Sequence, residues 1–268
     1  MVDFNVQGKV AVVTGGTRGL GLYCAEAFVL NGASAVVISS RKQKACDESK
    51  KYLEKLAADN GKTCRVIGIA ADVSKESDCN LLFEETSKHF KKVDILVANA
   101  GATWGAPIGD HPISAMHKVL ALNVVGVFNC IQLFTPLLEE AGTPEDPARV
   151  VIMSSVASIV SLDAAGVYGY TASKAGVSHM GKSLALQLGP RNITVNSLAP
   201  GYFPTKMANG LIEVAGDILV DTNPRRRLGE KEDIQSAILF LCSKQSNYIN
   251  GVVLPLDGGT HLAPGARL

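Results

Sequence analysis

A tyrosine and a lysine four residues apart form the most informative pair in this chain. Tyr170 and Lys174 enclose the stretch YTASK, and on a helix this spacing places both side chains on one face. A free tyrosine loses its proton near pH ~10, about three units too high for acid–base work at neutrality. A fixed cation beside the phenol would lower its pKa. We therefore expect a pair that exchanges a proton with a carbonyl or alcohol oxygen near neutral pH.

A glycine-rich segment follows the first predicted strand and opens the first predicted helix. It runs from Thr14 to Gly21, with glycines at Gly15, Gly19 and Gly21. Such a turn lets the backbone approach a pyrophosphate and directs the N-terminus of a helix at it. The spacing differs from the commoner G-x-G-x-x-G. The prediction of a dinucleotide site therefore depends on the strand before the glycines and the helix after them.

The end of the second predicted strand indicates which dinucleotide binds. Many dinucleotide-binding folds place an acidic residue about 20 residues beyond the glycines, where it holds the ribose hydroxyls of NAD. Here that position is Arg41, preceded by Ser40. A carboxylate would repel a 2′-phosphate, whereas Ser40 and Arg41 would bind it, and Arg18 adds a second guanidinium from the glycine segment. We predict NADP(H) as the cofactor.

Short apolar runs alternate with longer helical patterns along the whole chain. The runs are nearly continuous in aliphatic residues, which is typical of strands in a parallel sheet covered on both faces. The alternation predicts one doubly wound α/β domain over residues 1–268, with right-handed crossovers. The predicted strands are Lys9–Thr14, Ser34–Ser40, Cys64–Ala70, Val93–Ala98, Arg149–Ser155, Thr194–Leu198 and Gly251–Leu256.

The predicted helices lie between these strands. Asn31-Gly32 and Asn60-Gly61 are residue types that end helices, and Ser74 is the expected N-cap of the third helix. The segment Gly201–Gly229 is too long for a plain connection, so we expect a substrate loop at about 201–229. The predicted helices are Gly19–Leu30, Lys42–Asp59, Lys75–Phe90, Ile113–Glu139, Tyr170–Leu188 and Lys231–Ser243.

Composition argues against several classes of partner. Lys and Arg total 26 against 25 for Asp and Glu, so charge gives no basis for binding nucleic acid or an anionic membrane. The longest apolar runs are far shorter than a membrane span, and the N-terminus shows no secretory pattern. The six cysteines and five histidines have no metal-ligand spacing, so we expect no metal site and no disulfides.

Several short motifs occur in a fixed order along the chain and together resemble the short-chain dehydrogenase/reductase family. The resemblance covers nearly the whole chain, from Gly8 to Gly259. It implies NAD(P)(H) chemistry, a seven-stranded Rossmann-type sheet and, commonly, a homotetramer. The motifs are the glycine segment, Asn99-Ala100-Gly101, Asn123 in LNVVG, Ser154-Ser155, Tyr170 with Lys174, and Pro200-Gly201.

The resemblance also implies roles for individual residues. Tyr170 would be the general acid/base, and Lys174 would lower its pKa and hold the nicotinamide ribose. Ser155 would hydrogen-bond the substrate oxygen. Asn123 would hold a helix and a water of a proton relay. The cofactor-binding set is Gly15, Thr17, Arg18, Gly19, Leu20, Gly21, Ser40, Arg41, Asp72, Val73, Asn99, Gly101, Tyr170, Lys174, Pro200, Gly201, Phe203 and Thr205.

Three positions keep alternatives open. Ser155 lies 15 residues before Tyr170 and Ser158 lies 12 before it, so Ser158 competes for the serine role, although the serine pair favours Ser155. Tyr168 either lines the substrate mouth or only packs there. Trp104 either walls the substrate pocket or belongs to the core.

The substrate class is narrowed by local resemblance. Residues 99–105, 146–150 and 201–207 are similar to 3-oxoacyl reductases of the rhamnolipid-biosynthesis type, and residues 39–43 to NADP-dependent peroxisomal carbonyl reductases. Both imply reduction of a ketone to a secondary alcohol. The alternatives are a steroid, sugar or polyol dehydrogenase of the same family, and a non-catalytic NADP(H)-binding protein. Arg225-Arg226-Arg227 could attract a phosphopantetheine or coenzyme A phosphate.

The last three residues are relevant to the subcellular localisation of the protein. Ala266-Arg267-Leu268 is a small–basic–Leu ending, which fits a degenerate form of the peroxisomal Ser-Lys-Leu signal. The scattered cysteines fit a reducing cytosol equally well. We expect the protein in the cytoplasm or, through this ending, in the peroxisome.

Overall fold

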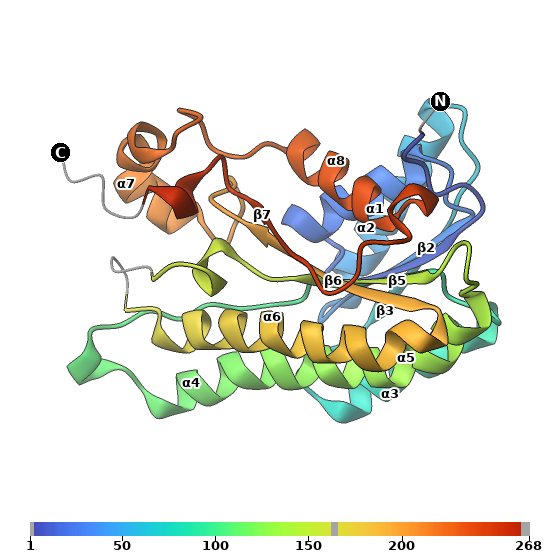
Figure 1. The fold of residues 1–268 in the computed structure, drawn as a ribbon, viewed down its shortest axis with the longest axis horizontal. Helices are drawn as coiled ribbons and strands as arrows, with labels where there is room; N and C mark the ends of the chain where they lie inside the picture. Colours follow the sequence, from blue (N-terminus) through green and yellow to red (C-terminus); the bar gives the residue numbers. More distant parts are fainter. Residues whose placement is uncertain (1–2, 162–165, 264–268) are drawn as a thin grey trace.

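The computed structural model describes residues 3–161 and 166–263. Within these residues seven strands form one sheet in the order β3-β2-β1-β4-β5-β6-β7, and all neighbouring strands are parallel (Figure 1). The C-terminal Ala266-Arg267-Leu268 lies outside the described residues. The strands are β1 (Val10–Thr14), β2 (Ala35–Ser40), β3 (Arg65–Ala70), β4 (Ile95–Ala98), β5 (Ala148–Met153), β6 (Ile193–Pro200) and β7 (Val253–Leu256).

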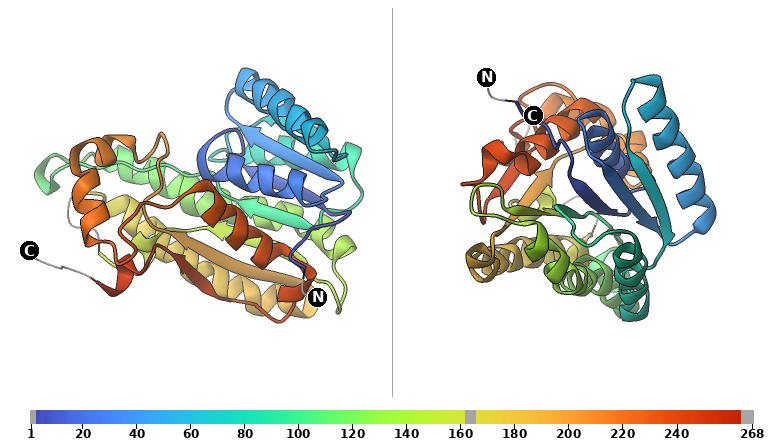
Figure 2. Two further views of the ribbon diagram at one scale, coloured as in Figure 1. Left: turned by 90° about the horizontal axis from the view of Figure 1, so that it is seen from above. Right: turned by 90° about the vertical axis from the view of Figure 1, so that its right-hand side faces the viewer.

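Helices cover both faces of this sheet. They are α1 (Gly19–Leu30), α2 (Gln43–Asp59), α3 (Glu76–His89), α4 (Ile113–Leu120), α5 (Val127–Ala141), α6 (Tyr168–Leu188), α7 (Asn209–Thr222) and α8 (Lys231–Cys242). Helices α1, α2 and α8 lie on one face, and α3 to α6 lie on the other (Figure 1), with the twisted sheet between the two layers (Figure 2). The predicted Rossmann-type doubly wound fold with seven parallel strands is confirmed.

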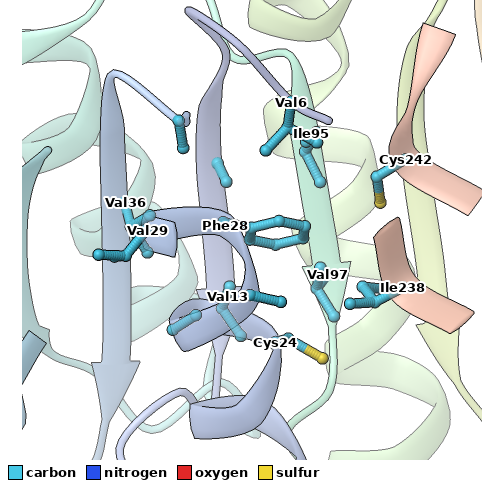
Figure 3. Packing of buried hydrophobic residues seen from close by; sticks show 14 of the residues in the cluster. Val6, Val13, Cys24, Phe28, Val29, Val36, Ile95, Val97, Ile238 and Cys242 are labelled. Atoms are coloured by element: carbon cyan, nitrogen blue, oxygen red, sulfur yellow. The ribbon is translucent and has the colours of Figure 1, made fainter. Parts of the chain in front are cut away.

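The core consists of two apolar clusters, one on each side of the sheet. Alternate strand residues face opposite clusters: Val13 belongs to one and Val12 to the other. On the side of α1, the ring of Phe28 lies against the strands that carry Val13 and Val97, with Ile238 of α8 beside it (Figure 3). Because both faces are covered, every residue of β1, β4 and β5 is buried, as continuous apolar runs require.

The last crossover connection, from β6 to β7, has the opposite handedness to the others. The steps from β5 to β6 and from β6 to β7 run in the same direction across the sheet. Yet Val177 of α6 packs into the cluster on one face and Ile238 of α8 into the cluster on the other. The β6–α8–β7 connection is therefore left-handed, against the right-handed default. Helix α6 already covers the face of β6 that a right-handed return would use.

Local signals in the sequence fix some helix ends and not others. Asn31 and Asn60 are C-caps, followed by Gly32 and Gly61 with positive φ, as predicted. The prediction that Ser74 caps α3 is wrong. Lys75 holds that position, and the Ser74 hydroxyl instead donates to Asp72 Oδ1 at 2.7 Å, a local acceptor that competes with the helix.

Two longer segments depart from their predicted form. Residues 201–229 contain α7, a 14-residue helix without a buried residue, where the sequence predicted an irregular loop. The predicted helix Ile113–Glu139 runs from Ile113 to Ala141, but its middle, Ala121–Gly126, has π-helical hydrogen bonding. Among the described residues this rod is the one helix long and apolar enough to cross a membrane, and 44% of its most apolar window is buried. Core helices of folded domains pass the same test.

Candidate active site

A cleft of about 740 Å³ opens at the carboxyl ends of β1 to β5. This is the edge where a doubly wound sheet binds its ligand. Most of the predicted cofactor-binding residues line this cleft, although they come from segments far apart in the sequence. These are Gly15, Thr17, Arg18, Gly19, Leu20, Ser40, Arg41, Asp72, Val73, Asn99, Gly101, Tyr170, Lys174 and Thr205.

The glycine segment forms the floor of the cleft between β1 and α1. Gly15 and Gly19 adopt positive φ angles of 65° and 53°, which glycine adopts without steric cost. A Cβ on Gly21 would clash with Asn99 Nδ2 and with the carbonyl oxygen of Gly15. Asn99 Nδ2 also donates to Thr14 O at 2.8 Å. Gly21 and the Asn99 amide therefore hold the glycine turn in place, but Gly21 itself does not line the cleft.

The cleft suits an anionic ligand. The first turn of α1 carries no acidic residue, so the positive end of its dipole faces the cleft uncompensated. Arg18, Arg41 and Lys42 add positive charge at the ends of β1 and β2, and among the lining residues only Asp72 is acidic. The Ser39 hydroxyl on the same wall is buried without a hydrogen-bond partner. These features fit a phosphorylated dinucleotide.

Tyr170 and Lys174 lie in the first two turns of α6, on the inner wall of the cleft. Lys174 Nζ donates to the carbonyl oxygen of Met153 at 2.7 Å and lies 5.6 Å from the centroid of the Tyr170 ring. Lys174 is only 5% exposed, and burial lowers its pKa to about 8. The spacing thus places both side chains on one face, as the sequence predicted.

The lowered pKa expected for Tyr170 is not found. Burial raises the pKa of its phenol, and a hydrogen bond with the Ser155 side chain only partly opposes this effect. The Lys174 ammonium is bonded to a backbone carbonyl beside the ring. Desolvation of the phenolate therefore outweighs the lysine charge, a balance that the four-residue spacing alone could not predict.

The geometry favours Ser155 over Ser158 as the serine of the site. Ser155 lies two residues beyond the end of β5, and its hydroxyl accepts a hydrogen bond from the Ala157 amide at 3.2 Å and contacts Tyr170. The Ser158 hydroxyl donates to the carbonyl oxygen of Ser155 at 2.7 Å, within its own turn. Ser158 is therefore engaged locally, whereas Ser155 lies against the phenol.

Asn123 lies in the π-helical segment and joins three elements. Its Oδ1 accepts from the Ala102 amide, and its Nδ2 donates to Ala102 O and to Ser173 Oγ, each at 2.9 Å. Helical irregularities of this kind are frequent at functional sites. A Cβ on Gly101 would lie 3.3 Å from Asn123 Oδ1 and 3.5 Å from Lys174 Nζ. The amide thus ties the α4–α5 rod to the loop after β4 and to α6, beside Lys174.

Comparison with known proteins agrees with this geometry. Residues 15–261 match the family described as Enoyl-(Acyl carrier protein) reductase. The chain is 35% identical to the rhamnolipids biosynthesis 3-oxoacyl-[acyl-carrier-protein] reductase of Pseudomonas aeruginosa, covering 97% of this chain and 98% of that protein. It is also 35% identical to a 3alpha-hydroxysteroid dehydrogenase of Mediterraneibacter gnavus, covering 94% and 97%.

A solved structure is similar over the same length. The Pseudomonas aeruginosa RhlG/NADP active-site complex superposes with a TM-score of 0.89 at 35% identity, covering 96% of this chain and 98% of that one. The chain belongs to the short-chain dehydrogenase/reductase family. It is an NADP(H)-dependent oxidoreductase, and the cofactor predicted from Ser40 and Arg41 is confirmed.

Besides Gly21, three residues that the family resemblance places at the cofactor do not line this cleft. Phe203 is 4% exposed and belongs to the apolar core on the α1 side, where a Cβ on Gly229 would clash with its ring. Pro200 ends β6 as a buried residue, and a Cβ on Gly201 would meet Asp257 at 2.8 Å. The Phe203 side chain therefore belongs to the core, and the chain returns to the cleft lining at Pro204 and Thr205.

The two predicted substrate residues also lie outside the cleft lining. Trp104 is 51% exposed, so it does not belong to the core. Tyr168 is 43% exposed, and its ring packs edge to face on His111 with centroids 5.7 Å apart. Neither residue is part of the cleft lining, although Thr103, next to Trp104, and Tyr170, two residues after Tyr168, belong to it.

Several cleft residues were not predicted. Tyr23 lies four residues after Gly19, on the same face of α1, so helical spacing could have identified it. Lys206 and Met207 follow Thr205 directly. Ser39 precedes Ser40 at the end of β2, Met153 is the last residue of β5, and Ser154 follows it. Ser39, Met153 and Ser154 could have been predicted to line the cleft because they lie at the carboxyl ends of strands.

The three arginines proposed to attract a carrier phosphate differ in whether an acidic side chain pairs with them. Arg227 forms two hydrogen bonds with the Asp233 carboxylate, at 2.6 and 2.8 Å, and Arg226 pairs with Asp221. Arg225 is exposed and lines a smaller cavity, of about 180 Å³, beside Tyr202. Two of the three charges are therefore compensated within the protein.

Proposed function

We propose that the protein reduces the ketone of a 3-oxoacyl compound, or of a related carbonyl compound, to a secondary alcohol with NADPH. The main support is the contact between the Ser155 and Tyr170 side chains beside buried Lys174, where Tyr170 and Lys174 line the NADP(H) cleft. No side chain can transfer hydride, so the bound cofactor supplies it. The side chains supply the proton and orient the carbonyl.

The proposed mechanism assigns one task to each residue. Ser155 and Tyr170 donate hydrogen bonds to the carbonyl oxygen, which gains negative charge in the transition state. Tyr170 then gives its proton to this oxygen. Because burial raises the pKa of the phenol, Tyr170 holds that proton at neutral pH, as an acid in the reducing direction must. Protonated Lys174 stabilises the phenolate that remains. Asn123 holds the loop and helices that frame the lysine.

The substrate class can be tested by NADPH oxidation with a panel of carbonyl compounds. We expect the highest kcat/KM for 3-oxoacyl thioesters, since a 3-oxoacyl reductase is among the similar proteins. The panel also contains diketones, aromatic ketones, sugars and 3-oxosteroids, because a hydroxysteroid dehydrogenase is equally similar. A steroid that exceeds every thioester tenfold would replace the 3-oxoacyl assignment. Absence of turnover with every carbonyl would favour a protein that only binds NADP(H).

A homotetramer is the expected assembly. Apolar side chains remain exposed on the rod and on α6: Val125 is 62% exposed, Phe128 42% and Leu186 79%. Exposed apolar side chains on long helices are typical of contacts between subunits. Multi-angle light scattering should give four times the chain mass, and Leu186→Glu should shift the population to smaller species. Val214→Glu on α7, at a residue 86% exposed, is the matched control. A wild-type protein that stays monomeric at micromolar concentration would contradict the prediction.

A further inference from the structure

Two thiols from different helices meet in the core beside Val73, a residue of the cleft lining. Cys79 of α3 and Cys130 of α5 are 0% and 1% exposed, and their sulfur atoms lie 3.6 Å apart in a hydrogen bond. Four residues further along each helix, Phe83 and Phe134 pack edge to face with centroids 5.6 Å apart. The same helix–helix contact therefore holds both the aromatic pair and the thiol pair in register.

The surroundings of Cys79 favour its ionised form. Hydrogen bonds from the Cys130 thiol and from the Asn129 side chain lower the pKa of Cys79, against the opposing effects of burial and of nearby Asp78 and Asp72. In contrast, burial raises the pKa of Cys24, another core thiol. A thiolate is the nucleophilic form of cysteine. Cys79 is thus the thiol of the pair whose pKa is lowered, which suits it to attack an oxidant.

We propose that Cys79 and Cys130 form a redox modification site that closes to a disulfide between α3 and α5. The oxidant is a peroxide. The Cys79 thiolate attacks one peroxide oxygen and the O–O bond breaks, which gives a sulfenic acid and a hydroxide that is protonated to water. The Cys130 sulfur then attacks the Cys79 sulfur, loses its proton and expels the second hydroxide, also as water. Two thiols and one hydrogen peroxide give one disulfide and two waters.

The burial of the pair sets the rate of this reaction. Asn129, which contacts Cys79, is partly exposed, so the thiol lies one side chain below the surface. A small peroxide can reach it when the α3–α5 contact opens transiently. Oxidation of this pair should therefore be slower than oxidation of a surface thiol. Among the buried cysteines, only Cys79 and Cys130 should be oxidised.

Closure of the disulfide would alter the cofactor site. A disulfide places its sulfurs about 2.05 Å apart, so the two sulfur atoms, now 3.6 Å apart, must approach by roughly 1.5 Å through side-chain rotation and movement of the helices. The Cys79 thiol also donates to the carbonyl oxygen of Val73 at 3.4 Å, and this bond is lost on oxidation. A Cβ on Gly126 would clash with the same carbonyl oxygen, so the start of α5 abuts Val73. Because Val73 lines the cofactor cleft, we expect weaker NADPH binding.

The test uses the full-length protein, hydrogen peroxide and mass spectrometry. After oxidation, free thiols are alkylated in denaturant and the disulfide peptides are identified. We expect a Cys79–Cys130 peptide to form first and to disappear on treatment with dithiothreitol. NADPH affinity, measured by cofactor fluorescence, should fall about three- to tenfold in the oxidised protein, the range for one lost hydrogen bond, and should recover on reduction.

Two variants separate the disulfide from other oxidation. Cys130→Ser should bind NADPH as the wild type does and should form no disulfide at Cys79 after peroxide treatment, because no partner thiol remains. Cys242→Ser, which alters a buried thiol outside the pair, should stay peroxide-sensitive. Absence of the Cys79–Cys130 peptide in the wild type, or its appearance only after other cysteine pairs, would overturn the proposal. A disulfide that forms without any change in NADPH affinity would overturn its link to the cofactor site.

Discussion

Replacement of Tyr170 by phenylalanine is expected to reduce turnover by about 10² or more, the usual contribution of a general acid, while NADPH still binds. The phenol contacts Ser155, and Tyr170 lines the cleft beside Lys174. The ring remains in Tyr170→Phe, so packing around Lys174 is preserved and only the proton is lost. Single-turnover reduction rates and cofactor fluorescence titrations measure the two effects separately. A rate within a few-fold of the wild type would contradict the assignment.

Tyr168→Phe is the matched control for this substitution. It removes a hydroxyl from the same helix, two residues earlier, outside the cleft lining, and should leave turnover within a few-fold. The pH profile adds a second readout. Burial keeps the Tyr170 phenol protonated at neutral pH and sets the pKa of Lys174 to about 8. Lys174 loses its charge as the pH rises through about 8, so kcat/KM for ketone reduction should fall on the alkaline side of that value.

The parts of the site that were predicted correctly depend on short stretches of sequence. The glycine turn between β1 and α1, and the shared face of Tyr170 and Lys174, follow from local backbone geometry. The preference for NADP(H) could be inferred from Arg41 because a positive charge at the end of the second strand lies where the 2′-phosphate of the cofactor binds in this fold. Such features need no knowledge of how distant elements pack.

The errors arise where packing between distant elements decides the outcome. The pKa of Tyr170 depends on how deeply α6 and the neighbouring loops bury the phenol. The core position of Phe203 depends on Gly229, which leaves space for its ring. Helix α7 carries apolar residues at helical spacing, such as Leu211, Val214 and Ile218, and the sequence analysis missed it. None of its residues is buried, so no packing against the core accompanies this pattern. Cys79 and Cys130 are 51 residues apart and meet only because α3 packs on α5.

Replacement of Arg41 by aspartate is expected to weaken NADPH binding by about one to two orders of magnitude. A charge-assisted hydrogen bond contributes roughly 1.5–3 kcal/mol, and each ~1.4 kcal/mol corresponds to a factor of ten in affinity. The new carboxylate would also repel the 2′-phosphate while offering an acceptor to the ribose hydroxyls of NADH. Affinity for NADH should therefore rise or stay level, and the preference between the cofactors should decrease or reverse.

The control for Arg41→Asp must change the charge equally without touching the cleft. Lys51→Asp on the exposed side of α2 meets this condition. If Arg41 acts by direct contact with the 2′-phosphate, only Arg41→Asp should change the ratio of NADPH to NADH affinity, and the wild-type preference should weaken as salt screens the phosphate charge. If the two substitutions change the ratio equally, the effect comes from overall charge and not from a contact at Arg41. Equal kcat/KM values for NADPH and NADH in the wild type would show that Ser40, Arg41 and Arg18 do not select the cofactor.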